Sequence, residues 1–171
     1  MKSMNLLFRA TIATLPLAAF SLALAQPVGR KSDKPHSSFD RFKSLAGDWT
    51  GAAGTIRFKL SAGGSVVEEI YFPDTKQEMV NMITRDKSNI VLVHYCMMGN
   101  QPRMKASDKV SGNTTAFKFI SGGNMESDAD MHMHNVTFTF VDADTLKEKW
   151  VSYKDGKPAG AAVEWVVKRK K

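Results

Sequence analysis

Three of the four histidines and the only cysteine lie in two short segments, as His94 with Cys96 and as His132 with His134. Residues two apart on a β-strand point to the same face of the sheet. Imidazole is the commonest metal ligand in proteins, and it also serves as a base or as a hydrogen-bond partner. The spacing therefore predicts two polar groups on strand faces that otherwise carry apolar side chains.

The segments around these residues alternate apolar and polar positions with a period of two. Strands are predicted over residues 55–60, 65–72, 79–85, 90–98, 102–107, 114–120, 132–141, 146–153 and 161–168. About nine short strands, spaced roughly ten residues apart and joined by short turns, are typical of an all-β barrel or sandwich. The short connections favour an antiparallel up-and-down order. Closure into a barrel removes the unpaired edges of so long a meander.

One helical segment precedes the strands. Phe39, Phe42 and Leu45 recur at helical spacing, and Ser37 or Ser38 is placed to cap the first turn. Gly47 is placed to end it. The pattern predicts a short helix or 3₁₀ turn ahead of the barrel.

The segment Leu45-Ala46-Gly47-Asp48-Trp49-Thr50-Gly51 follows this helical turn and enters the meander. It resembles the opening of calycin barrels, the lipocalins and nitrobindin-type haem barrels, in which Gly-x-Trp closes one end. The resemblance covers about residues 39–168 and extends to small exported bacterial lipocalin-like domains of unknown function. It implies that Gly47 and Trp49 close the barrel. The chain departs from these families because it lacks a mid-chain Thr-Asp-Tyr segment and a histidine near the carboxyl end, so a haem site is not implied by position.

The amino terminus has the features of an export signal. Lys2 and Arg9 precede an apolar stretch over 10–25, and Ala23 and Ala25 provide a small-x-small cleavage pattern. We expect a signal peptide at 1–25, a flexible lead-in at 26–37, one lipocalin-like domain at 38–168 and a basic tail at 169–171. The protein is expected to be periplasmic or secreted.

Composition limits the partners. The chain carries a formal charge of +7 and one cysteine, which excludes an intramolecular disulfide. No zinc-finger spacing or aromatic–basic interleaving supports nucleic-acid binding. No segment after the signal is long and apolar enough to insert stably in a membrane. A small apolar or amphipathic molecule is the expected partner.

These observations favour an exported barrel that holds a largely apolar ligand in its interior. The cavity walls are expected from six residues on the strands: Leu92, Phe117, Phe119, Val136, Phe138 and Trp165. The other expected ligand contacts are four polar side chains and the cysteine: His94, Cys96, Arg103, His132 and His134. Such pockets normally combine apolar walls with a few placed polar groups.

Three alternatives remain open. No cofactor is required, but His94, His132 and His134 could together hold a metal or a haem. Two strands separate the two pairs in a meander, so these side chains could meet only across the barrel interior. A small hydrolase or isomerase could use His94 with Cys96 or with Glu68, and Glu69 replaces Glu68 if the register slips by one residue. No arrangement of nucleophile, base and orienting residue is evident, however. A filled barrel that serves only in protein interactions is the third alternative.

Overall fold

The computed structural model describes residues 37–171, so the predicted signal peptide at 1–25 and nearly all of the lead-in lie outside the described residues. One short helix, α1 (Ser38–Lys43), comes first. The strands follow as β1 (Gly47–Gly51), β2 (Gly54–Ser61), β3 (Val66–Tyr71), β4 (Met79–Asp86), β5 (Asn89–Tyr95), β6 (Gln101–Ser107), β7 (Thr114–Gly123), β8 (His132–Phe140), β9 (Thr145–Lys154), β10 (Lys157–Pro158) and β11 (Val163–Arg169), with a 3₁₀ turn at Ala62–Gly64.

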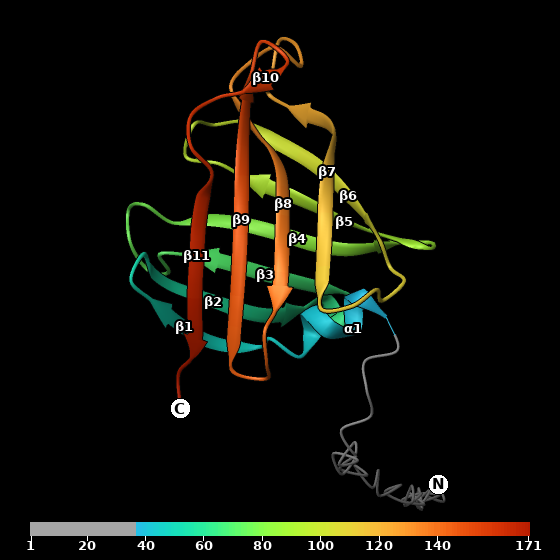
Figure 1. Cartoon of the computed structure of the whole chain (residues 1–171), viewed down its shortest axis with the longest axis vertical. Helices are drawn as coiled ribbons and strands as arrows, with labels where there is room; N and C mark the ends of the chain where they lie inside the picture. Colours follow the sequence, from blue (N-terminus) through green and yellow to red (C-terminus); the bar gives the residue numbers. More distant parts are fainter. Residues whose placement is uncertain (1–36) are drawn as a thin grey trace, which may run out of the picture. The chain divides into compact units, whose positions relative to one another are not determined.

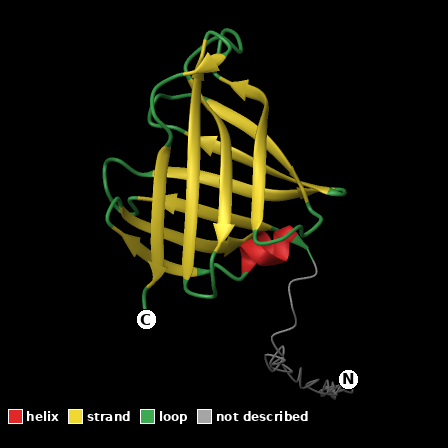
Figure 2. Cartoon of the chain, viewed as in Figure 1, coloured by secondary structure: helices red, strands yellow, loops and turns green. Residues whose placement is uncertain are grey.

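Antiparallel pairing runs from β1 through β9 in chain order, and the ring then closes through β11. β9 pairs with both β8 and β11, and β11 pairs with β1. Ten strands of the described residues therefore form a closed barrel, and β10 only adds a two-residue pair at the end of β9. Figures 1 and 2 show this wall of strands and the single helix beside it. The predicted all-β, antiparallel up-and-down barrel is confirmed.

The strand count differs from the expected nine because β1 is a strand in its own right. Of its five residues only Trp49 is buried, so no period-two pattern marks it in the sequence. Two other boundaries move. β5 ends at Tyr95, before a turn in which the Gly99 amide donates to the Cys96 carbonyl, and β7 continues to Gly123.

The inward face of β3 is the one that carries Glu69. Glu69 lies directly opposite Phe58 of β2, and directly opposed residues share a face. Phe58 is buried in the core, so Glu69 also faces the interior and is fully buried. Glu68 points outward and its carboxylate lies 3.7 Å from the Lys59 amine. The expectation that Glu68 faces inward is wrong, and the one-residue alternative with Glu69 holds.

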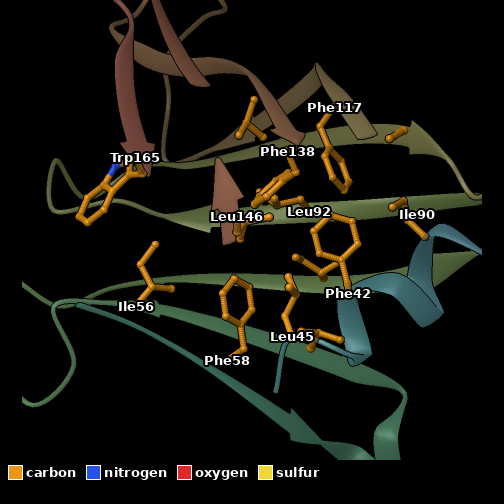
Figure 3. Close-up of a cluster of buried hydrophobic side chains, with 14 of the residues drawn as sticks. Phe42, Leu45, Ile56, Phe58, Ile90, Leu92, Phe117, Phe138, Leu146 and Trp165 are labelled. Carbon is orange, nitrogen blue, oxygen red and sulfur yellow. The ribbon is translucent and has the colours of Figure 1, made fainter. Parts of the chain in front are cut away.

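Helix α1 lies at one end of the barrel, beside the start of β7 (Figure 1). The Ser37 hydroxyl caps it by accepting the Asp40 amide at 3.1 Å. Phe42 then projects among the barrel side chains, as Figure 3 shows, with its ring edge-to-face on Phe138 at 4.9 Å and near Phe117 at 5.8 Å. The Ser38 amide donates to the Asp108 carbonyl, which anchors the helix to the end of β6. The predicted short helical turn is confirmed.

Trp49 lies at the same end of the barrel and is completely buried. Its indole N–H donates to the Leu45 carbonyl at 2.7 Å, and the Arg169 guanidinium lies 4.4 Å from its ring centre. Arg169 also donates to the carbonyls of Ser44 and Ala46. The end of β11 is thereby joined to the segment that precedes β1.

We expect Phe42→Ala to lower the free energy of unfolding by about 3–5 kcal/mol, because it removes a fully buried ring and leaves a cavity. Urea unfolding followed by tryptophan fluorescence measures the change. Leu60→Ala is the matched control, since Leu60 is 42% exposed, and it should cost about 0.5 kcal/mol or less. Similar losses in both variants would show that α1 is not part of the cooperative core.

Candidate functional site

A chain of polar side chains crosses the barrel interior above the apolar core. Asn81 on β4 connects its first half: the His94 ring shares a 2.7 Å hydrogen bond between Nδ1 and Asn81 Oδ1, and Asn81 Nδ2 donates to Glu69 Oε2 at 2.6 Å. Glu148 on β9 is the acceptor for the hydrogen bonds of the second half. Its Oε2 accepts the Tyr71 hydroxyl at 2.5 Å and the Trp150 indole N–H at 3.1 Å. All of these side chains are buried.

The carboxyl groups of Glu69 and Glu148 are neighbours in this interior, and each has one buried oxygen, Oε1, with no hydrogen-bond partner among the described residues. Burial and the neighbouring Glu148 charge raise the pKa of Glu69 well above its usual value, and burial also raises the pKa of Glu148. Glu148 keeps the lower pKa of the two because it accepts the Tyr71 and Trp150 donors. The raised pKa favours the protonated form of Glu69, whose proton can be donated to Glu148. This shared proton supplies a partner to carboxyl oxygens that would otherwise lack one.

The hydrogen bonds of Asn81 determine the tautomer of His94. Because Asn81 Nδ2 donates to Glu69, the atom that Asn81 presents to His94 is the amide oxygen Oδ1, which can only accept. His94 Nδ1 must therefore carry the hydrogen. His94 Nε2 is then an unprotonated acceptor. It is buried and has no hydrogen-bond partner among the described residues. Burial lowers the pKa of His94 from 6.5 to about 4, so the ring is neutral at physiological pH.

A pocket of about 270 Å³ lies beside His94 at the end of the barrel opposite α1. Its lining is mostly aromatic and apolar, from the strand ends at that opening: Tyr71, Phe72, Met79, His94, Met133, Trp150, Val163 and Trp165. Within this lining, the rings of Tyr71 and Trp165 pack against each other with their centroids 5.1 Å apart. The arrangement is that of a small-molecule pocket, with apolar walls and one unsatisfied acceptor on the ring of a lining residue.

His132 and His134 form a separate group with two other aromatic residues. His132 lies opposite Tyr153 on β9, whereas Met133 lies opposite Ser152. Ser152 alternates with the inward-facing Trp150, so Met133 faces the interior beside His94. His132, in contrast, is fully buried against the Phe119 and His134 rings and does not line the His94 pocket. A bulge at His134 interrupts the pairing, and this explains why the two-residue period expected from the sequence fails here.

Hydrogen bonds and ring stacking hold the separate group together. His132 Nδ1 donates to the Asp130 carbonyl at 2.6 Å, and its Nε2 accepts His134 Nδ1 at 2.9 Å. The His134 ring stacks on Tyr153 with a centroid distance of 3.8 Å and on Phe119 at 5.0 Å. The three histidines are therefore not brought together, and Phe119 lies with this group instead of lining the His94 pocket.

The remaining residues expected at the site lie elsewhere. Arg103 is exposed on β6, on the face opposite the buried Met104, and Cys96 follows the end of β5 with intermediate exposure. Phe138 packs in the core with Phe42 and Phe117. Leu92 and Val136 are also core residues, and of the expected cavity walls Trp165 alone lines the His94 pocket. Within residues 37–171, no group of three or more His, Cys, Asp or Glu side chains is placed to hold a metal ion.

Sequence reasoning missed the residues that connect His94 to the core, namely Asn81, Tyr71 and Glu148. A signal existed for Glu148, because it shares the period of the apolar Leu146 and Trp150 along β9. An acidic residue in phase with two buried ones predicts a buried carboxyl. Asn81 carried no comparable signal, since its neighbours Met79 and Ile83 identify its face only once the register of β4 is known.

No protein-family model matches the chain, and no curated protein matches it significantly. Among the described residues, no helix has the length and apolar character needed to cross a bilayer.

We expect His94 to stay neutral well below pH 6 because its pKa is lowered to about 4 by burial. Its contribution to stability is complete above the unfolded pKa of 6.5 and is lost as pH falls toward 4, with a slope of up to about 1.4 kcal/mol per pH unit. Long-range ¹H–¹⁵N spectra should show a ring protonated at Nδ1 that titrates near pH 4. Urea unfolding should show a weaker acid dependence for His94→Gln, and a His94 titration near pH 6.5 would contradict the assignment.

Glu69→Gln tests the shared proton. The pKa of Glu69 is raised in the folded state, so its stabilising contribution is complete below the unfolded value of 4.5 and is lost as pH rises. Wild type should therefore lose stability relative to Glu69→Gln above pH 4.5, by up to about 1.4 kcal/mol per pH unit. Glu68→Gln, the outward-facing neighbour, is the control and should follow the wild-type pH profile. Parallel profiles for wild type and Glu69→Gln would mean that the carboxyl is ionised in the fold.

Proposed function

We propose that this protein is an exported binding protein that holds a small, largely apolar molecule in the pocket beside His94. The observation that carries the proposal is a hollow of about 270 Å³ at one end of a barrel whose other end is filled. The hollow opens to solvent and its walls are almost wholly apolar, with one buried polar ring atom that lacks a partner among the described residues, as in many small-molecule sites. Export is proposed on the amino-terminal segment 1–25, which has the pattern of a signal peptide.

The volume of the pocket limits the size of the ligand. An apolar cavity of about 150 Å³ accommodates benzene, and pockets for drug-sized molecules span about 300–1,000 Å³. A hollow of about 270 Å³ is suited to a molecule with one or two small rings or a short branched chain. Met79 and Met133 line it, and their flexible thioethers allow modest adjustment to the shape of a guest.

A haem or a multi-ligand metal site does not fit these residues. His94 does have its Nδ1 held by a second residue, as metal-binding histidines usually do. However, a haem is larger than the pocket volume, and structural metal sites need three or four protein ligands. His132 and His134 belong to the separate aromatic group and add no ligand to His94. Ligand binding in an apolar pocket is therefore preferred.

Filling the mouth of the pocket should block binding. We expect Val163→Trp to weaken the affinity for a small aromatic probe such as indole by at least tenfold, because the added ring occupies the hollow beside Trp165. Isothermal titration calorimetry measures the affinity. Val166→Trp is a matched control on the same strand, since Val163 is 47% exposed and Val166 is 50% exposed but lies outside this pocket.

The control variant should bind indole as wild type does. If neither indole nor any other small aromatic probe bound the wild-type protein, the proposal of a ligand pocket would fail. Equal weakening by both tryptophan substitutions would place the binding site elsewhere on the barrel.

A further inference from the structure

We infer that the ligand of this pocket carries a hydroxyl or N–H donor on an otherwise apolar body and donates it to His94 Nε2. This inference rests on the proposed binding function and names the chemical class of the ligand. It follows from the hydrogen-bond directions in the buried polar chain, which leave the acceptor nitrogen of the lining residue His94 without a donor.

The direction of each hydrogen bond in the chain follows from the one before it. Glu148 accepts from Tyr71 and Trp150, and it takes the shared proton from Glu69. Glu69 in turn accepts from the Asn81 amide. The Asn81 carbonyl oxygen is left to accept from His94 Nδ1. The tautomer of the imidazole is thereby imposed by a carboxyl pair at the other end of the chain.

The other nitrogen of the ring points away from this polar chain. Nδ1 and Nε2 lie on opposite sides of an imidazole, and Asn81 occupies the Nδ1 side. The ring lines the pocket and packs at 5.2 Å from Trp150. Nε2 is thus a buried lone pair with no partner among the described residues, on a ring that lines an apolar hollow. A buried acceptor without a donor costs free energy, and a ligand donor removes that cost.

The same chain argues against ligands of other charge or polarity. Tyr71 also lines the pocket, but its hydroxyl donates to Glu148 and is not free to bind a ligand acceptor. The Trp150 N–H is engaged in the same way. A carboxylate or phosphate would be buried in an apolar pocket whose lining residues include no Lys or Arg to pair with it. A neutral phenol, alcohol or indole-like molecule meets the requirements of the site.

Two isosteric probes test the inference: 4-methylphenol, which has a donor, and 1,4-dimethylbenzene, which replaces the hydroxyl by a methyl group. The quantity to measure is the ratio of their dissociation constants, by calorimetry and by titration of the Trp150 and Trp165 indole N–H signals. We expect this ratio to shift by at least tenfold against 4-methylphenol in His94→Phe. His134→Phe makes the same change outside the pocket and should leave the ratio as in wild type.

A ratio that is the same in wild type and in His94→Phe would overturn the donor inference while leaving the binding proposal intact. If neither probe bound the wild-type protein, the binding proposal itself would fail. A measurement on wild type alone covers the case in which His94→Phe does not fold. The His94 Nε2 nitrogen signal should move on saturation with 4-methylphenol and stay in place with 1,4-dimethylbenzene, and an unmoved signal with both bound probes would also overturn the inference.

Discussion

The interior of this barrel depends on the proton shared between Glu69 and Glu148. Two carboxylates cannot both ionise at such close range in an apolar core, and an isolated buried charge would cost far more than the fold can supply. With a proton shared between them the pair avoids a double charge, and Tyr71, Trp150 and Asn81 donate to its oxygens. Each of these donors comes from a strand in the barrel wall, so the pair also joins β3, β4 and β9 across the interior.

This polar layer separates two regions with different packing. On the α1 side, the rings of Phe42, Phe117 and Phe138 meet edge to face and fill the space, as Figure 3 shows. On the other side, the large rings of Trp150 and Trp165 stand around a hollow. The filled half supplies most of the apolar burial that stabilises the fold. The half that contains His94 can consequently remain hollow without unfolding the barrel, which is how binding sites are commonly supported by a rigid scaffold.

The sequence predicts the wall of the barrel better than its contents. Strands with strict alternation, such as β2 and β7, are evident from Ile56 and Phe58 and from Thr115 and Phe117. A tertiary pairing was needed to decide whether Glu68 or Glu69 faces inward, because both alternations are compatible with β3 alone. The bulge at His134 is equally invisible in the sequence. It interrupts the alternation at one residue, and His132 and His134 pack with Phe119 and Tyr153 apart from the His94 pocket.

In the proposed binding mode, the polar chain allows a single histidine to orient a guest. A lone buried imidazole could exchange tautomers and act as donor or acceptor, so it would distinguish poorly between ligands. His94 cannot do so at low cost, because reversing its tautomer requires the Asn81 amide to turn over and lose its bond to Glu69. The burial of Asn81 and Glu69 therefore serves to fix one acceptor in one direction. Burying these polar groups costs free energy, but it holds the His94 acceptor in one orientation before a ligand arrives. In the proposed site, this would give the apolar hollow a preference for ligands with a donor, which its apolar walls alone cannot provide.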